Sequence, residues 1–411
     1  MRVKNLKYII FILSLSYLHS MEFKVASYNV ENLFDMQYNG TEYKEYIPNK
    51  HNWTQSILNQ KLTNISEVIC EIDADIIALQ EIENRNALKL LQNSLKSFGC
   101  NYKYGAITYN KRTAIEVALL SKIPIQTHNN IVVSKKLKIR NILEVKFLID
   151  NNPLYIFVNH WSSKRSLSNQ SKRLASAEAL SRRVNSLPNG SEYIILGDFN
   201  CNYNSYDIAY ILKTVKKNGE MVRECNLNIS TRYNLWLEEP IYKRWSYNFY
   251  GKKEGIDAII IPYTLFNGRG IDYINNSFSI FKRDYLFHKR GYIFRWEYKK
   301  GRHRGVGYSD HLAISAKFST NDYKKENCNI ELGSIGELFQ KTIHLPMMLK
   351  DVEVVSKFKN GLYIKDNSTD RKIAIFGIDK QLIVGKTYNM VVYKRILYNN
   401  RYEITDFSII H

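Results

Sequence analysis

Cysteine is scarce in this sequence, with five among 411 residues, and no two of them form a C-x-x-C pair. The five are Cys70, Cys100, Cys201, Cys225 and Cys328. Pairs with C-x-x-C spacing supply many structural zinc sites, so their absence argues against such a site. An odd number also leaves at least one thiol outside any disulfide, and the spacing alone identifies no partners.

Long apolar runs are also missing, with one exception at the N-terminus. Residues 1–20 begin with basic residues and continue as an apolar run from Tyr8 to Leu18. This layout is typical of a secretory signal peptide and is short for a membrane span. We therefore expect a secreted or periplasmic protein. Leu18 and Ser20 fit a small-x-small cleavage site only loosely, so an uncleaved anchor is the alternative, and only in that case do we expect a membrane location.

Acidic residues are outnumbered in this chain. The sequence has 39 aspartates and glutamates against 59 lysines and arginines, which gives a formal net charge of +20. A strongly basic chain favours a polyanionic partner, such as nucleic acid or an anionic membrane surface. A general bias toward lysine, with no binding role, is the plainer explanation. The sequence contains no internal repeat, which argues against a repeat architecture.

The hydrophobic pattern predicts strands that alternate with helices. Helical spacing of apolar residues occupies 54–72 and 170–187, and shorter apolar runs predict strands. Strands that alternate with helices and also pair as hairpins indicate sheets covered by helices, an α+β class. Apart from one apolar run, residues 204–300 are aromatic, basic and only weakly periodic. Strands are expected at 23–30, 75–81, 117–120, 143–149, 154–158, 193–196, 257–261 and 312–316.

The chain divides into four parts by composition. Residues 1–20 form the expected signal peptide, residues 21–319 a catalytic domain, and residues 320–344 a polar linker. Residues 345–411 contain about five short strand candidates separated by turn residues, a pattern that predicts a small C-terminal β-barrel.

Polar residues interrupt the predicted strands at their ends. Four strands are followed by such residues, and the last two strands are preceded by them. If all of them belong to one site, the last two strands must run opposite to the first four. The sheets are then mixed or antiparallel, and a doubly wound parallel sheet is disfavoured. The residues are Asn29 and Glu31, Glu81, Asn159 and His160, Asp198 and Asn200, Asp257, and Asp310 and His311.

These residue types suit hydrolysis at phosphorus. Glu81 and Asp310 offer hard oxygen ligands for Mg²⁺, which neutralises phosphate charge and stabilises the leaving oxygen. Histidines such as His160 and His311 can donate hydrogen bonds to the developing negative charge. A carboxylate such as Asp257 can orient His311 and keep it protonated. Asp198 can position or deprotonate the attacking water.

The segments YNVENL, LQEIEN, NHWSSK, LGDFN, IDAII and GYSDHLAI occur in this order. Together they resemble the endonuclease/exonuclease/phosphatase superfamily over about residues 22–318. The resemblance implies a four-layered α/β sandwich, in which two packed mixed sheets are flanked by helices, with a divalent-metal site at one rim. It also implies Mg²⁺ as the cofactor, with Mn²⁺ or Ca²⁺ as alternatives, and no small-molecule cofactor.

The resemblance assigns roles position by position. Glu81 is the expected principal metal ligand, with Asn29, Glu31 and Asp310 close to the metal or its waters. Asp198 and Asn200 are expected to hold the nucleophile and a phosphate oxygen, and His160, Asp257 and His311 to serve the transition state. Glu31 stands where many members have aspartate. Glu116 is either the carboxylate that pairs with His160 in deoxyribonuclease-like members or a residue without that role.

These motifs give the reaction type but not the substrate, because the superfamily also includes sphingomyelinases and inositol-phosphate phosphatases. Basic residues favour a phosphate backbone, although a solvated basic face is the alternative. We expect Asn29, Lys164, Arg165 and Arg173 to contact substrate. Lys172 and residues 299–305, KKGRHRG, add to the basic clusters.

The C-terminal segment resembles an OB-fold. In such a barrel, exposed aromatics such as Tyr388, Tyr393 and Tyr398 can stack single-stranded bases, although packing inside the barrel is the alternative. The sequence therefore predicts an exported Mg²⁺-dependent nuclease with little sequence preference, acting on DNA, with RNA as the alternative substrate. A sphingomyelinase-like phospholipid phosphodiesterase, or a phosphatase, is the main alternative, and residues 245–251, WSYNFYG, are its only candidate membrane loop. A non-catalytic nucleic-acid-binding protein is disfavoured, because every proposed catalytic position holds a competent residue.

Overall fold

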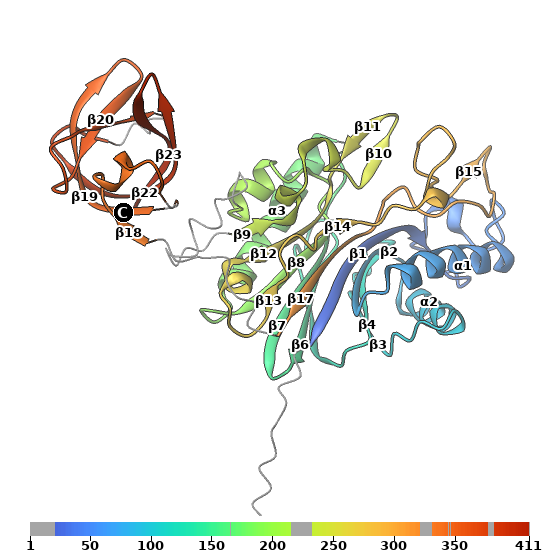
Figure 1. The fold of residues 1–411 in the computed structure, drawn as a ribbon. Coiled ribbons are helices and arrows are strands. Elements are labelled where there is room, and N and C mark those ends of the chain that lie inside the picture. The colour runs from blue at the N-terminus through green and yellow to red at the C-terminus, as the bar shows by residue number, and fades with distance from the viewer. Residues whose placement is uncertain are drawn as a thin grey trace, which may run out of the picture.

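The computed structural model describes residues 21–164, 166–214, 232–320, 331–343, 345, 347–376 and 382–410. The expected signal peptide, residues 1–20, lies outside this range, as do residues 321–330 and 344 of the expected linker. Two large sheets with few helices make up residues 21–320, and a third sheet forms the C-terminal part of the chain (Figure 1). The predicted α+β class is confirmed at this level.

The first sheet has seven strands, in the order β13-β17-β1-β2-β4-β3, with β14 also paired to β17. β1 and β2 run parallel, whereas β17 is antiparallel to β1 and β4 is antiparallel to β2. The sheet is therefore mixed, as the strand-end pattern predicts. Its strands are β1 (Glu22–Leu33), β2 (Ile76–Ile82), β3 (Tyr104–Ile107), β4 (Glu116–Ser121), β13 (Asp272–Tyr273), β14 (Ser279–Ile280) and β17 (Ile314–Ser319).

The second sheet has six strands, in the order β5-β6-β7-β8-β12-β9. β7 and β8 run parallel and β12 runs antiparallel to β8. The end of β7, the end of β8 and the start of β12 consequently meet at one edge. The strands are β5 (Ile125–Ile131), β6 (Ile142–Ile149), β7 (Asn152–His160), β8 (Glu192–Asp198), β9 (Arg232–Asn234) and β12 (Asp257–Pro262).

The two faces of β2 explain how the layers pack. Ile77 and Leu79 lie in a buried cluster with α1 (Gln55–Ile72) and α2 (Arg85–Ser97). Alternate residues, such as Ile76, lie in a second cluster that contains residues of both sheets and of α3 (Leu167–Asn185). Because successive strand residues point to opposite faces, a strand buried on both faces is a continuous apolar run.

The helices begin and end where local chemistry allows. The Thr54 side chain accepts a hydrogen bond from the backbone N–H of Ile57 at the start of α1, which matches the expected helix at 54–72. The helix ends at Asp73, which has a left-handed backbone. The helix expected at 170–187 is α3, and it begins and ends slightly earlier. α2 was not predicted.

Residues 204–300 contain many short elements, which explains their weak periodicity. Three of them take part in two small hairpins: β10 (Tyr247–Phe249) pairs with β11 (Lys252–Glu254), and β15 (Tyr298–Lys299) pairs with β16 (Arg302–His303), just beyond this stretch. Short helical turns lie between the strands, and the chain also has one such turn near its N-terminus. These turns are η1 (Lys44–Tyr46), η2 (Asp207–Ile211), η3 (Leu235–Glu238), η4 (Ile241–Lys243), η5 (Tyr263–Phe266) and η6 (Asp284–Leu286).

The C-terminal sheet has its own buried core. Its strand order is β18-β19-β20-β21-β23-β22, and β22 also pairs with β19, so the sheet curves back toward itself. Ile335 and Leu338, which were expected in the linker at 320–344, lie in this core, so the structure places residues 331–343 with the C-terminal sheet. Its elements are β18 (Glu331–Gly333), η7 (Glu337–Phe339), β19 (Met347–Phe358), β20 (Gly361–Lys365), β21 (Ile373–Phe376), β22 (Thr387–Tyr398) and β23 (Arg401–Ile410).

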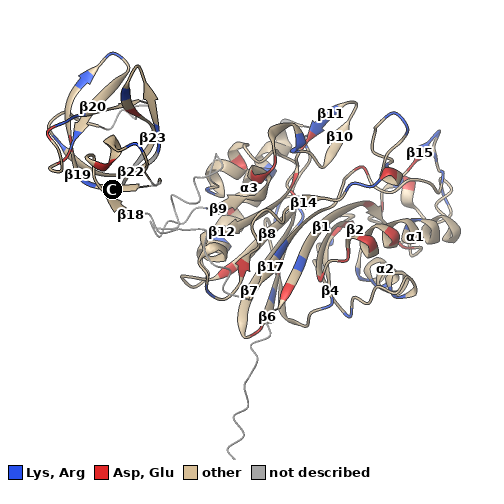
Figure 2. Ribbon diagram, in the orientation of Figure 1, with Lys and Arg blue, Asp and Glu red and all other residues tan. Residues whose placement is uncertain are grey.

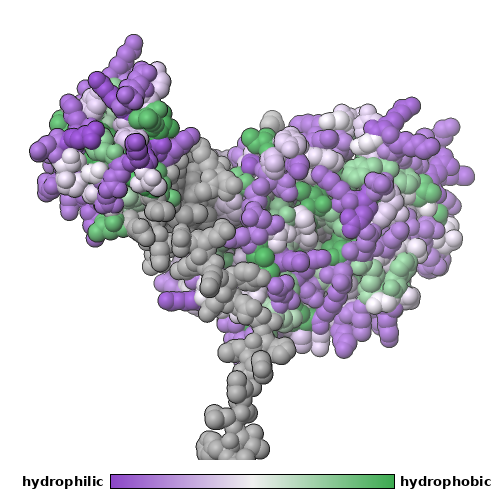
Figure 3. Space-filling model, viewed as in Figure 1, coloured by the Kyte–Doolittle hydropathy of each residue, from purple (hydrophilic) through white to green (hydrophobic). Residues whose placement is uncertain are grey.

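A disulfide joins Cys70 in α1 to Cys100, which follows α2. Cys201 is free and buried, and Cys225 and Cys328 lie outside the described residues. Most of the surface drawn in Figure 3 is hydrophilic, with hydrophobic side chains in small patches. Within the described part of the chain, no helix combines the length and the apolar character needed to span a membrane.

Candidate active site

Strand register brings the strand-end residues together at one rim. In the second sheet, Asp198 is the register partner of His160 on β7 and of Asp257 on β12. In the first sheet, Asn29 on β1 is the register partner of Gln80, directly before Glu81 on β2. Side-chain contacts then join the two sheets across this rim.

Asp198 is the centre of these contacts. Its Oδ2 accepts hydrogen bonds from Nδ2 of Asn29 at 3.1 Å and from Nδ2 of Asn200 at 3.2 Å. Its Oδ1 accepts the backbone N–H of Asn200 at 2.8 Å. Nε2 of His160 lies 3.5 Å from Oδ2, and Nε2 of His311 lies 3.8 Å from the same atom. The four neighbours of Asp198 all come from the set that the sequence predicts.

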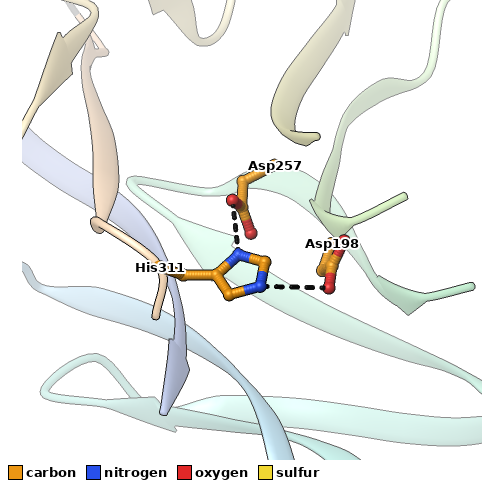
Figure 4. A group of neighbouring side chains, drawn as sticks. All are labelled: Asp198, Asp257 and His311. Carbon is orange, nitrogen blue, oxygen red and sulfur yellow. Dashed lines mark hydrogen bonds and ion pairs between the residues drawn. The ribbon is translucent and has the colours of Figure 1, made fainter. Parts of the chain in front are cut away.

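His311 lies between two carboxylates, as Figure 4 shows. Its Nδ1 is 2.8 Å from Oδ2 of Asp257, and that same oxygen accepts a hydrogen bond from the Ser246 hydroxyl at 2.5 Å. Burial by itself would lower the pKa of His311, but the carboxylates of Asp257 and Asp198 outweigh it and hold that pKa well above its ordinary value. His311 is therefore an imidazolium, whose Nε2–H points toward Asp198.

The other groups of the rim have different protonation preferences. Burial raises the pKa of Asp198 to about 7, although the neighbouring His311 opposes the shift. Burial, Arg140 and His311 together hold the pKa of His160 well below its ordinary value. His160 is therefore neutral, and its buried Nδ1 has no hydrogen-bond partner in the described part of the structure. The two histidines thus differ in charge because their neighbours differ.

Glu116 does not provide the missing partner of His160. Its carboxylate accepts hydrogen bonds from the Thr108 hydroxyl at 2.5 Å, the Thr113 hydroxyl at 2.7 Å and the backbone N–H of Asn110 at 2.9 Å. The structure therefore gives Glu116 a role in holding the segment between β3 and β4.

Glu81 and Asp310 fit a divalent cation. Both side chains are partly exposed at the rim, with 18% and 22% of their surface accessible. Burial raises the pKa of Glu81, and repulsion by Asp310 raises it further. Nδ2 of Asn29 donates to Oε1 of Glu81 at 3.2 Å, which orients that carboxylate. Two carboxylates at an open rim, one of which raises the pKa of the other, form a donor set suited to Mg²⁺.

Asp198, Asp257 and His311 form a second group that is close enough to hold an ion, with one ligand atom of each within 4.8 Å of the others. In this group, however, Nδ1 of His311 faces Asp257 and Nε2 faces Asp198, so the protonated ring has no lone pair for a metal. The imidazolium already supplies the positive charge between the two carboxylates.

Glu31 occupies a different environment from the one expected of a metal ligand. The Arg295 guanidinium donates to Oε1 of Glu31 through Nε at 2.8 Å and also through Nη2, and the backbone N–H of Trp296 donates to Oε2 at 2.9 Å. Nη2 of Arg295 is also 3.4 Å from Oδ2 of Asp310. Glu31 therefore anchors Arg295 beside Asp310, and both of its oxygens have protein partners.

Two buried or half-buried cations of this region were missed by sequence reasoning. Arg295 lies in the weakly periodic stretch, where nothing in the sequence links it to Glu31. Lys61 lies in α1, is fully buried, and donates from Nζ to the backbone oxygen of Tyr308 at 3.0 Å. Burial lowers the pKa of Lys61 to about 8. In the sequence, Lys61 lies on the apolar face of the predicted helix, and this position is the one feature that could have indicated a buried lysine.

The expected substrate-binding cations differ in placement. Lys164 is exposed, and its Nζ is 2.8 Å from Oε1 of Glu254 on β11. Arg173 is buried, and its Nη1 donates to the backbone oxygens of Ser162 and Ser163, so it holds the loop after β7 instead of facing solvent. Arg165 lies outside the described residues.

Comparison with known families decides the wider relationship. Residues 24–319 match the model of the Endonuclease/Exonuclease/phosphatase family. The chain belongs to this family. The resemblance inferred from the six motifs is thereby confirmed at family level, and the chain is assigned to a family of phosphoester hydrolases. No curated protein matches the sequence.

The solved structures to which this family member is similar have low sequence identity to it. A humanized TDP2 from D. rerio is 12% identical, with a TM-score of 0.48, over 72% of this chain and 98% of that chain. A truncated TDP2 from Caenorhabditis elegans is 16% identical, with a TM-score of 0.45, over 72% and 97%. SmcL is 18% identical, with a TM-score of 0.42, over 72% and 98%.

Proposed function

We propose that this family member is an exported, divalent-metal-dependent nuclease that hydrolyses phosphodiester bonds in DNA with little sequence preference. The observation that carries the proposal is the position of His311, held as an imidazolium between Asp257 and Asp198 at the rim that also carries Glu81 and Asp310. The layered packing of helices and sheets around this rim supports the four-layered sandwich that the sequence predicts.

Glu81 and Asp310 would hold the metal ion, with Asn29 orienting Glu81. Mg²⁺ is the favoured ion and Mn²⁺ or Ca²⁺ are the alternatives, because all three accept oxygen ligands. When bound, the ion neutralises phosphate charge and stabilises the leaving oxygen.

The protein groups supply the remaining chemistry. Asp198, with its pKa raised to about 7, is poised to accept a proton from the attacking water near neutral pH. Asn200 fixes both oxygens of that carboxylate. Nε2–H of His311 donates to the phosphate oxygens as negative charge develops, and Asp257 holds the ring in place. Neutral His160 can donate a hydrogen bond from Nε2 to a second phosphate oxygen.

The charge distribution supports a nucleic-acid substrate. The net charge is +20, and the hairpin that follows Arg295 carries exposed cations from β15 to the segment after β16 (Figure 2). Exposed cations bind a phosphate backbone by releasing its counterions. These hairpin cations are Lys299, Lys300, Arg302 and Arg304.

Further features support the finer parts of the proposal. The disulfide between Cys70 and Cys100 is consistent with export, because disulfides persist in oxidising compartments. Pairing of β22 with both β19 and β23 is consistent with an OB-like barrel. Of the three tyrosines expected to stack bases there, Tyr398 is 60% exposed, and the Tyr388 hydroxyl accepts the backbone N–H of Ile383. The side chain of Tyr393 lies outside the described set.

A phospholipid phosphodiesterase is the second candidate, on one observation. The segment 245–251 contains Tyr250, which is 90% exposed, and Phe249, which is 49% exposed. Exposed aromatics of this kind can enter a membrane interface.

One assay separates the two candidates. Protein from Met21 onward is incubated with Mg²⁺ or with EDTA against plasmid DNA, single-stranded DNA, RNA and sphingomyelin vesicles. Metal-dependent loss of supercoiled plasmid, absent in Asp198→Asn, is the expected result. Hydrolysed lipid with intact nucleic acids would overturn the nuclease and keep the metal-dependent reaction.

A further inference from the structure

A cavity of about 460 Å³ opens directly beside the proposed metal and phosphate site. Residues 247–250 of the β10–β11 hairpin, Tyr292, Ile293, Arg295 and Asp310 form its walls. Its volume lies in the range of pockets that enclose a small ligand. Asp310 is a proposed metal ligand, so a group in this cavity would be attached next to the phosphate undergoing hydrolysis.

The cavity is joined to the catalytic histidine by backbone and ring contacts. Tyr247 forms an isolated antiparallel bridge with His311, and the centroids of the two rings are 4.9 Å apart. The ring of Phe249 lies nearly parallel to that of Tyr247, with centroids 6.3 Å apart and an interplanar angle of 12°. Aromatic walls therefore extend outward from His311 itself.

The rings that border the cavity are exposed without an evident structural purpose. Tyr250 is 90% exposed, and Phe249 and Tyr292 are each 49% exposed. Aromatic groups gathered at a cavity beside an active site indicate a ligand surface. Flat rings accept other flat rings, and base–aromatic stacking occurs with every base because each has a π-face.

Two polar groups of the wall identify the kind of ligand. Arg295 places a planar guanidinium there, which can stack on a nucleobase. Asn248 has a buried Oδ1 for which the described residues provide no hydrogen-bond partner. An unpartnered amide oxygen is costly, and the N–H groups at the edge of a base can satisfy it.

The base of the hairpin is fixed, so the cavity is formed before any ligand binds. Oε1 of Glu254 lies 2.8 Å from Nζ of Lys164 and 3.2 Å from Nζ of Lys252. Ser246 lies directly before β10. Its hydroxyl donates to Asp257, and its backbone oxygen accepts the backbone N–H of Leu312 at 2.7 Å. Pre-formed walls reduce the ordering cost of binding.

We propose that this cavity binds the nucleobase adjacent to the scissile phosphate, so that the enzyme prefers unpaired nucleotides. The inference rests on the proposed function and specifies its substrate. A base that is stacked and paired inside a duplex cannot enter the cavity without being extruded, which costs free energy. Single-stranded DNA, strand ends and mismatches are then cut in preference to an intact duplex.

The test uses three p-nitrophenyl phosphodiesters that share the leaving group and the bond that breaks. Their other ester group is a thymidine 5′-oxygen, a methyl group or choline. In each, water attacks phosphorus, the P–O bond to p-nitrophenolate breaks, and its two electrons leave with that oxygen. For the full chain with Mg²⁺, we expect kcat/KM for the thymidine ester to exceed that for the methyl ester by about ten-fold, because one base stacks on aromatic rings.

Substitutions in the cavity wall test whether the preference for the thymidine ester arises there. Phe249→Leu and Asn248→Ala should each lower kcat/KM for the thymidine ester toward the value for the methyl ester. Phe249→Trp keeps an aromatic ring and should retain the preference for the thymidine ester. Tyr242→Ala is the matched control, because Tyr242 is 75% exposed in η4 and lies outside the cavity. We expect it to leave both rates unchanged.

Each outcome has one meaning. Equal kcat/KM for the thymidine and methyl esters would overturn the base pocket and leave the proposed phosphodiesterase intact. Fastest hydrolysis of the choline ester would overturn the base pocket in favour of a phospholipid headgroup. No hydrolysis of any ester would overturn the proposed function, and this inference with it.

Discussion

Replacing Asp257 with asparagine tests the catalytic arrangement most directly. The change keeps the size of the side chain and removes its charge. Asp257 is 1% exposed and His311 is 6% exposed, and their 2.8 Å contact is the shortest that His311 makes with a carboxylate. Asparagine can still accept a hydrogen bond from Nδ1–H, but it cannot stabilise the imidazolium by charge.

The size of the effect follows from the burial of this pair. Breaking a buried ion pair costs about 3–5 kcal/mol, and a neutral hydrogen bond that remains returns about 1 kcal/mol. The remaining loss of about 2–4 kcal/mol corresponds to a decrease in kcat of about 30-fold to 1,000-fold. Stability should also fall, because the pair with Asp257 stabilises the folded state, and His311 limits this loss by becoming neutral.

The assay measures kcat for a p-nitrophenyl phosphodiester at saturating Mg²⁺, together with the thermal midpoint. Asp272→Asn is the control, since Asp272 is also a buried strand aspartate, 3% exposed on β13, and lies outside the candidate site. We expect the control to keep its kcat. A kcat for Asp257→Asn within about three-fold of wild type would refute the charged role of Asp257.

The other predictions concern the metal site, the pH dependence, the disulfide and the C-terminal part. Glu81→Gln should raise the Mg²⁺ concentration for half-maximal activity by about ten-fold, and Glu31→Gln should raise it less, because Glu31 already has protein partners; equal shifts in a Mg²⁺ titration would contradict this. Burial raises the pKa of Glu192 to about 7, so the folded state binds the extra proton between pH 4.5 and 7 and stability falls as pH rises through that window. Urea unfolding at pH 5 and pH 8 should show a smaller difference in Glu192→Gln than in wild type, and an unchanged difference would count against the shift. Cys70→Ser should lower the free energy of unfolding by about 3–4 kcal/mol, as expected for a closed loop of 30 residues, and an unchanged denaturation midpoint would argue that the disulfide does not form. Deleting residues 330–411 should preserve turnover of small esters and weaken binding to long DNA, and unchanged affinity and salt dependence would remove the case for a nucleic-acid-binding barrel.

The rim residues were predictable because of how strands end. A buried strand is an apolar run, so a carboxylate or imidazole near its end stands out, as Glu81 does next to the last residue of β2 and Asp198 does at the end of β8. The requirement that all such ends meet at one place also predicted the antiparallel direction of β12 and β17. This reasoning needs only the direction of each strand and no knowledge of side-chain contacts.

The remaining parts depend on contacts between distant residues. Arg295 reaches Glu31 across 264 positions, and no local pattern marks either residue as the partner of the other. The β10–β11 hairpin has strands of three residues each, too short for a period to be recognised. The cavity beside Asp310 therefore could not be predicted, although WSYNFYG was noticed for its aromatic content.

Glu31 shows how the same chemistry leads to different roles at one rim. It follows Asn29 in β1, and the family resemblance predicts that it lies close to the metal or its waters, with Glu81 as the principal ligand. In the folded protein it is 5% exposed, and burial raises its pKa to about 8, an effect that the nearby Asp310 strengthens and Arg295 opposes. A carboxylate so far removed from water needs a fixed partner, and the two-pronged contact with Arg295 supplies one. Glu81 keeps an open face, and among the described residues no lysine or arginine forms an ion pair with it, which leaves it available to a metal ion. The two glutamates therefore differ in their access to solvent: the buried one positions the Arg295 wall of the cavity, and the more open one is the proposed metal ligand.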